Sequence, residues 1–191
     1  MASNSQLVCA GLWQWLQVPG LERFEFVRAG DEWVFRGTIL AMAKDAATEV
    51  RYEIVCDSLF HTRWASIFLR EPTGERTLNI EARDGRWFEN GSESHAVKGA
   101  IDIDLGWSPS TNTLPVRRLN LPVGHASGEF IAAWVRFPDL LLQPLPQEYL
   151  RLSEREYRYS SRGGAFKANL VVDGDGLVLD YEGFWRRAKS E

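Results

Sequence analysis

The sequence has little cysteine, histidine or methionine, and each shortage excludes a class of protein. Its 191 residues include two cysteines, three histidines and two methionines. Cys9 and Cys56 are too few for a disulfide-stapled secreted fold and too far apart for a C-x-x-C redox or zinc motif. We therefore expect two reduced thiols that pack as small hydrophobic side chains. His61, His95 and His125 show no ligand spacing, so we expect no metal site.

Positive charge is also scarce. Lys and Arg total 22 against 26 Asp and Glu, which gives a net charge of −4 and a pI of about 5.5. Protein–nucleic acid affinity depends on neutralising phosphates, so this balance argues against a nucleic-acid partner. No apolar run approaches the roughly 20 residues of a membrane-spanning helix. The first residues lack the positive start and apolar core of a secretory signal, so we expect a cytoplasmic protein.

The common catalytic motifs are missing as well. The sequence contains no G-x-S-x-G elbow, phosphate-binding loop, H-E-x-x-H helix or dinucleotide fingerprint. The run from Asp173 to Gly176, Asp-Gly-Asp-Gly, begins like a calcium loop, but Leu177 occupies a ligand position. We interpret this run as a hairpin turn and expect no cofactor.

What the sequence does contain is a period of two. In the segment from Thr48 to Asp57, an apolar row containing Val50, Tyr52 and Ile54 alternates with charged residues, which is typical of a half-buried strand. The same alternation predicts strands over Trp33–Leu40, Trp64–Leu69, Thr77–Arg83, Val97–Leu105, Glu129–Phe137, Phe166–Val172 and Leu177–Tyr181.

Turn residues and the lack of helical patterns define the expected fold. Asp84-Gly85 and Asn90-Gly91 are typical of tight hairpins, and no helical stripe of ten or more residues occurs. We count about a dozen strands at the usual length of about 5–6 residues. Short turns join antiparallel neighbours, so the sequence predicts an all-β, mainly antiparallel fold. Closing the sheet into a barrel would remove its exposed strand edges. We expect residues 1–191 to form a single-domain, open or closed β-barrel.

Aromatic residues are abundant. Eight tryptophans stand in the chain, and each can bury on the order of 150–250 Å². They suit a packed core, and they also suit the wall of a ligand cavity if the barrel is too wide for side chains to fill.

Two aspartates and two arginines form the most chemically suggestive cluster. If Val97–Leu105 is a strand, Asp102 and Asp104 project from the same face. Such a pair could act as acid and base, bind a cation, or stand in water at a rim. If the chain is extended at Arg117 and Arg118, only one of them shares that face, and it could bind a carboxylate through two hydrogen bonds.

The segment from Asp102 to Leu119 resembles the signature of a bacterial family of putative glycolipid-binding proteins. It contains Asp-x-Asp-Leu and then Thr-Asn-Thr-Leu-Pro-Val-Arg-Arg-Leu, similar to the family's D-x-D-L and T-N-T-L-P-I-R-R-L runs. Ser108-Pro109-Ser110 departs from the family's Thr-Pro-Phe. The resemblance implies a β-rich, open or closed barrel similar to periplasmic lipoprotein carriers, which hold acyl chains in an apolar cavity, and it assigns no catalytic residues.

Three functional hypotheses follow. The first is non-catalytic binding of a lipid or glycolipid in an apolar cavity, for which the candidate binding residues are Asp102, Asp104, Asn112, Arg117, Arg118 and Trp134. The second is an enzyme that acts on a hydrophobic small molecule with Asp102 and Asp104. The third is a protein-interaction module that uses a sheet edge or an exposed tryptophan patch to bind another protein. The sequence leaves the oligomeric state open.

Overall fold

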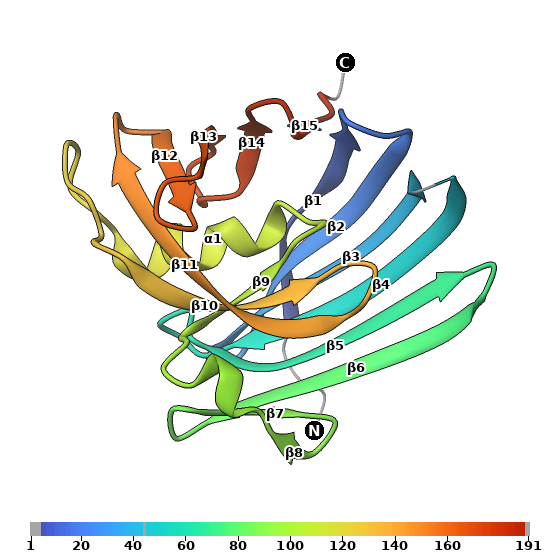
Figure 1. The fold of residues 1–191 in the computed structure, drawn as a ribbon. Helices are drawn as coiled ribbons and strands as arrows, with labels where there is room; N and C mark the ends of the chain where they lie inside the picture. Colours follow the sequence, from blue (N-terminus) through green and yellow to red (C-terminus); the bar gives the residue numbers. More distant parts are fainter. Residues whose placement is uncertain (1–4, 44, 190–191) are drawn as a thin grey trace.

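The computed structural model describes residues 5–43 and 45–189, which form one strongly curved, mainly antiparallel sheet with a short helix on its concave side (Figure 1). The first half of the chain forms β1 (Ser5–Trp15), β2 (Gly20–Ala29), β3 (Glu32–Ala43), β4 (Ala46–Cys56), β5 (Thr62–Glu71), β6 (Gly74–Arg83), β7 (Arg86–Glu89) and β8 (Ser92–Glu93).

The second half begins with irregular segments and returns to strands. It forms the 3-10 turn η1 (His95–Val97), β9 (Asp102–Leu105), the 3-10 turn η2 (Ser110–Asn112), α1 (Thr113–Leu119), β10 (Phe130–Arg136), β11 (Leu141–Arg151), β12 (Glu156–Ser161), β13 (Phe166–Val172), β14 (Val178–Tyr181) and β15 (Trp185–Arg187).

The strand order places β8 and β9 at the two edges of the sheet. The order runs from β8 through β1, then from β15 to β9, and β9 pairs with β10 in parallel whereas the other ladders are antiparallel. Among the described residues no ladder joins β9 to β8. The all-β, mainly antiparallel class is therefore confirmed, but the sheet has 15 strands rather than about a dozen and is not closed.

Side-chain and backbone contacts bring β9 close to β5 without a ladder. Thr62 Oγ1 accepts a hydrogen bond from the Ile103 amide at 2.9 Å, and the Thr62 amide donates to the Ile101 carbonyl at 3.4 Å. The two halves of the sheet thus enclose a common interior.

Local pattern explains most of the strands. In the inward row of β4, Val50, Tyr52 and Ile54 are at most 4% exposed, as the alternation predicted. Both glycine hairpins have positive φ at their two central residues, 54° and 70° at Asp84 and Gly85, as a tight type I′ turn requires.

Two segments differ from the sequence predictions. The strand expected from Val97 begins only at Asp102, because Val97 lies in η1 and Gly99 has a φ of 84°, which is not extended backbone. Arg117 and Arg118 lie in α1 rather than in an extended segment, so the argument from alternating strand faces was wrong for them.

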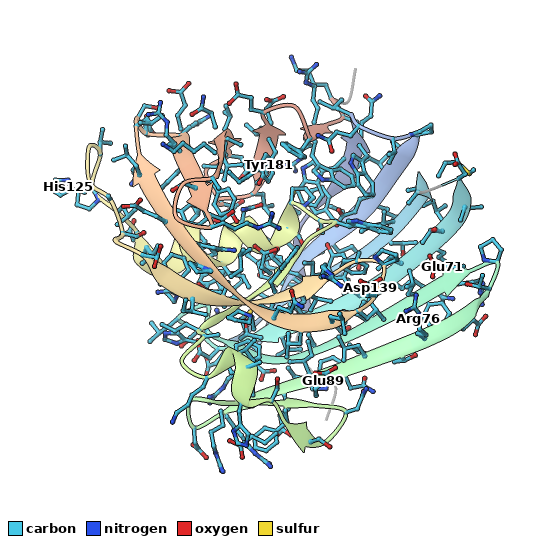
Figure 2. The ribbon with its side chains drawn as sticks, in the orientation of Figure 1. Glu71, Arg76, Glu89, His125, Asp139 and Tyr181 are labelled. Atoms are coloured by element: carbon cyan, nitrogen blue, oxygen red, sulfur yellow. The ribbon has the colours of Figure 1, made fainter. Side chains whose placement is uncertain are left out.

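The enclosed interior is filled mainly by side chains (Figure 2). Trp13 and Trp87 are at most 1% exposed, and their indole N–H groups donate to the carbonyls of Val178 and Ala100 at 2.7 and 2.9 Å. These tryptophans belong to the packed core. Both cysteines are free thiols. None of the helices among the described residues has the length and apolar character needed to cross a membrane.

Candidate functional site

Helix α1 carries most of the signature motif into the interior. Leu114 and Val116 are at most 6% exposed and pack against the two core clusters on either side of the helix. Asn120 ends the helix in the left-handed conformation, with a φ of 39°. The helix, which lies on the concave side of the sheet in Figure 1, therefore divides the interior. Along the chain η2 precedes it, and Arg117 and Arg118 lie in its last turn.

Arg118 and Asp102 form a buried ion pair between α1 and β9. Arg118 Nε donates to Asp102 Oδ1 at 3.0 Å, and an Nη donates to Oδ2 at 2.5 Å. The Asp102 side chain is 1% exposed and the Arg118 side chain 12%. Burial raises the pKa of Asp102, while the bonds and charge of Arg118 oppose that shift. The contact of two hydrogen bonds between an arginine and a carboxylate is thus present. Asp102 does not stand in water at a rim.

Asp104 has a different partner and a different environment. It is half-buried, and one of its oxygens accepts a hydrogen bond from the amide of Gln147 on β11. Desolvation raises its pKa to about 6, against the lowering effect of Gln147. Asp104 also lines a pocket, and Asp102 does not.

Asn112 and Trp134 reach the same pocket from η2 and β10. The Asn112 Nδ2 group donates to the Tyr149 hydroxyl at 2.8 Å, which fixes the orientation of the amide. Trp134 lies opposite Asp104 in the parallel ladder, and the Arg162 guanidinium stands over its ring at 5.2 Å. A Cβ at Gly106 would lie 2.7 Å from Trp134 Nε1, so glycine leaves room for the indole.

We call this hollow the aromatic pocket. It has a volume of about 190 Å³, and Asp104, Asn112 and Trp134 line it together with Tyr159, Phe166, Tyr181, Phe184 and Trp185. Tyr181 is the last residue of β14 and is labelled in the upper part of Figure 2. Three of the six predicted binding residues therefore share one pocket whose other walls are largely aromatic rings.

Arg117 and Arg118 line a second, larger hollow, which we call the arginine cleft. Its volume is about 640 Å³, and it lies among the β4–β5 loop, the C-terminal half of α1 and the β11–β12 and β13–β14 turns. Tyr157 lines the cleft and Ser161 the aromatic pocket. These residues lie four positions apart on β12, which corresponds to about 13 Å at about 3.3 Å per residue. Five of the six predicted residues are thus divided between two hollows, one beside η2 at the start of α1 and the other beside the C-terminal half of the helix.

Comparison with known proteins identifies the family. The model of a family described as "Putative glycolipid-binding" matches residues 11–187. The chain belongs to this family. The resemblance found in the signature motif is therefore confirmed over nearly the whole chain.

One solved structure is also similar to this family member. It is the crystal structure of a DUF1089 family protein from Pseudomonas aeruginosa, with a TM-score of 0.80 and 33% sequence identity. The alignment covers 88% of this chain and 92% of the other. No curated protein matches the sequence.

The family member also has a buried carboxyl that the sequence analysis overlooked. Glu22 on β2 is fully buried, and its Oε1 accepts hydrogen bonds from Tyr52 and Ser108, the latter at 2.8 Å. Desolvation raises its pKa to about 8, against the lowering effect of these two bonds. The alternation of β2 was the available signal, because Glu22 stands in the same inward row as Phe24 and Phe26.

An apolar groove lies on the outer face of the sheet, away from both interior hollows. It has a volume of about 490 Å³, and its lining includes Leu21, Leu40 and Met42, each at least 46% exposed. The three histidines do not gather at one site: His61 lines the arginine cleft, His125 lies on an outlying loop (Figure 2), and His95 is largely exposed.

Proposed function

We propose that this protein binds a glycolipid without transforming it, and that the sugar headgroup occupies the aromatic pocket. The observation that carries the proposal is the convergence of Asp104, Asn112 and Trp134 on one pocket with five further rings. Ligand pockets typically combine aromatic walls with a few oriented polar groups. The name of the family supports the same class of ligand.

The pocket chemistry suits a sugar. The C–H face of a pyranose ring is apolar and packs against aromatic rings such as Trp134, while its hydroxyl groups need hydrogen-bond partners. The Asp104 carboxylate accepts such bonds and Arg162 donates them. Gln147 and Tyr149 hold the Asp104 and Asn112 side chains in place through the hydrogen bonds described above.

The size of the pocket limits which part of the ligand enters. Its volume of about 190 Å³ is below the roughly 300 Å³ at which pockets for drug-sized ligands begin. The interior beyond it is occupied by core side chains such as Trp13 and Phe24. We therefore place the headgroup in the pocket and the acyl chains outside it, rather than in the large apolar cavity that the family resemblance implied.

The geometry favours binding over acid–base catalysis by the aspartate pair. Both oxygens of Asp102 are bound by Arg118, and Asp102 does not line the aromatic pocket. Asp104 thus has no free carboxylate partner in Asp102, as a two-carboxylate mechanism requires.

Octyl β-glucoside is the simplest probe of this function. We would titrate it into the protein below its micelle concentration and follow binding by native mass spectrometry and calorimetry, with octanol as the chain-only comparison. Trp134→Ala should weaken binding at least about tenfold, since a ring stacked on the sugar is lost. The matched control is Trp64→Ala, because Trp64 is an exposed tryptophan on β5 outside the pocket.

Two results would contradict the proposal. One is equal retention of octanol and octyl β-glucoside, which would show that the sugar is not recognised. The other is equal affinity of the Trp134→Ala and Trp64→Ala variants for the glucoside. Incubation with a bacterial lipid extract, followed by native mass spectrometry, then identifies the headgroup.

A further inference from the structure

We propose that the arginine cleft is a second binding site, which takes a phosphate monoester with an apolar substituent. The site is separate from the aromatic pocket and goes beyond the proposed glycolipid binding. It rests on the placement of Arg117, the balance of charge in the cleft, and the apolar character of the remaining wall.

Arg117 is held in place without a carboxylate. Its guanidinium stands 5.1 Å from the ring centre of Phe60 and 6.0 Å from that of Trp33. Its aliphatic stem packs on Gly176, where an added Cβ would lie 3.1 Å from Arg117 Cδ. Within residues 5–43 and 45–189, no carboxylate lies at ion-pair distance from Arg117.

A half-buried guanidinium of this kind has unused binding capacity. Arg117 is half-buried, and stacking on aromatic rings covers the flat face of its guanidinium but uses none of its five N–H donors. The side chain is already ordered by Phe60 and Gly176, so an anion that binds it loses little additional side-chain entropy.

The charges around Arg117 leave the cleft positive. Arg118 is neutralised by Asp102, and the cleft residue Asp173 is neutralised by Arg187 at 2.6 Å. Arg151 also adds a positive charge, and three of its five N–H donors are bound by backbone carbonyls such as that of Leu121 at 2.7 Å.

The remaining charged groups strengthen this balance. Arg155 lines the cleft, is exposed, and makes no ion pair in the described part of the chain, and Glu154 is the one lining carboxylate there without an ion pair. His61 faces the cleft as well and contacts Asp57 at 3.2 Å. Among the residues that the structure describes, three arginines of the cleft without an ion pair, Arg117, Arg151 and Arg155, therefore outnumber its one such carboxylate, Glu154. The cleft is thus positive although the net charge of the protein is −4.

The shape and walls of the cleft define the class of ligand. The guanidinium groups of Arg117 and Arg155 can each donate two parallel hydrogen bonds to the oxygens of a phosphate dianion. Buried apolar side chains form the adjoining wall: Phe60, Val116, Tyr157 and Val172. The volume of about 640 Å³ lies within the range of about 300–1,000 Å³ for ligand sites, so it accommodates an organic group as well as the phosphate.

Phenyl phosphate tests the site, and further probes separate the sources of the phosphate. We would measure the binding of phenyl phosphate, inorganic phosphate and phenylacetate by calorimetry. Flotation with phosphatidylcholine vesicles, with and without phosphatidic acid, tests a lipid source. Arg117→Gln and Arg155→Gln should each weaken phenyl phosphate binding at least about tenfold. Arg158→Gln is the control, because Arg158 is exposed on β12, outside the cleft.

The outcomes distinguish the proposal from its alternatives. Tight binding of phenyl phosphate, lost in both cleft variants and kept in the control, supports the site, and vesicle binding that requires phosphatidic acid identifies a lipid source. Equal binding of inorganic phosphate shows that the apolar wall is not used and overturns the monoester assignment. Equal weakening by all three substitutions, tighter binding of phenylacetate, or no binding of any probe overturns the site. Octyl β-glucoside binding should be unaffected by Arg155→Gln, so a failure here leaves the aromatic pocket to be judged by its own test.

Discussion

Tyr52 donates a hydrogen bond to Glu22 across strand β3, and its ring passes directly over the backbone of Gly37. The three residues lie on adjacent strands, with Tyr52 opposite Gly37 in the β3–β4 ladder and Gly37 opposite Phe24 in the β2–β3 ladder. A Cβ at position 37 would overlap the Tyr52 ring. The contact between the two polar residues therefore depends on the absence of a side chain between them.

Gly37→Ala should destabilise the protein by about 1–3 kcal/mol, which is the usual cost of overpacking a core. The φ of Gly37 is not in the left-handed region, so the cost arises from the collision with Tyr52 and not from the backbone. Urea unfolding of a double-mutant cycle with Tyr52→Ala measures this coupling. An equal loss in the Tyr52→Ala background would show that the collision is not the cause.

Glu22 should make stability fall as pH rises through neutrality. Its pKa is about 8 in the folded protein and about 4.5 for an unperturbed carboxyl, so the folded state holds the extra proton between these values. The contribution of Glu22 to the free energy of unfolding is therefore fully present below about pH 4.5. It decreases by about 1.4 kcal/mol per pH unit up to about pH 8. Chemical unfolding measured from about pH 6.5 to 8, above the pKa of about 6 of Asp104, should show this slope.

Glu22→Gln should remove that slope and make the protein more stable than the unsubstituted chain at pH 8. The amide keeps an oxygen to accept the bonds of Tyr52 and Ser108 but needs no ionisation. Glu81→Gln, which removes an exposed carboxyl, should leave the slope unchanged. A slope that survives in Glu22→Gln would show that another group holds the proton.

Arg118→Met should cost about 3–5 kcal/mol, because it leaves the buried carboxylate of Asp102 without its partner. Asp102→Asn combined with Arg118→Met should cost less than the sum of the two single substitutions, since no charge is then stranded. Arg36→Met provides the comparison: its exposed ion pair with Glu53 should contribute at most about 1 kcal/mol. Additive costs for the double substitution would contradict the assigned pairing.

Asp104 should make glycolipid binding dependent on pH. Its pKa is about 6, and the ionised carboxylate is the stronger acceptor for sugar hydroxyl groups. Affinity for octyl β-glucoside should rise between about pH 5 and pH 7 in the unsubstituted protein and stay constant in Asp104→Asn. Calorimetry at several pH values measures this. Identical pH profiles for both proteins would remove Asp104 from the binding site.

The period of two determined the strands because it is a local property of the chain. The strand predicted over Phe166–Val172 coincides with β13, and the inward row of β4 is buried as its alternation requires. The same rule, applied to β2, would have found Glu22. The glycine turns and the family signature were likewise readable from neighbouring residues alone.

The tertiary structure decided how distant segments combine. Helix α1 has seven residues and no apolar stripe of its own, and a helix this short is stabilised by packing rather than by propensity. Because of where α1 lies, Arg118 pairs with Asp102 and Arg117 has no carboxylate partner among the described residues. The predicted binding residues are therefore divided between the aromatic pocket and the arginine cleft. Whether the sheet closes also depends on contacts between remote segments, such as Thr62 with Ile103. Sequence periodicity fixes which face of a strand is buried, but it carries no information about which remote side chain meets that face.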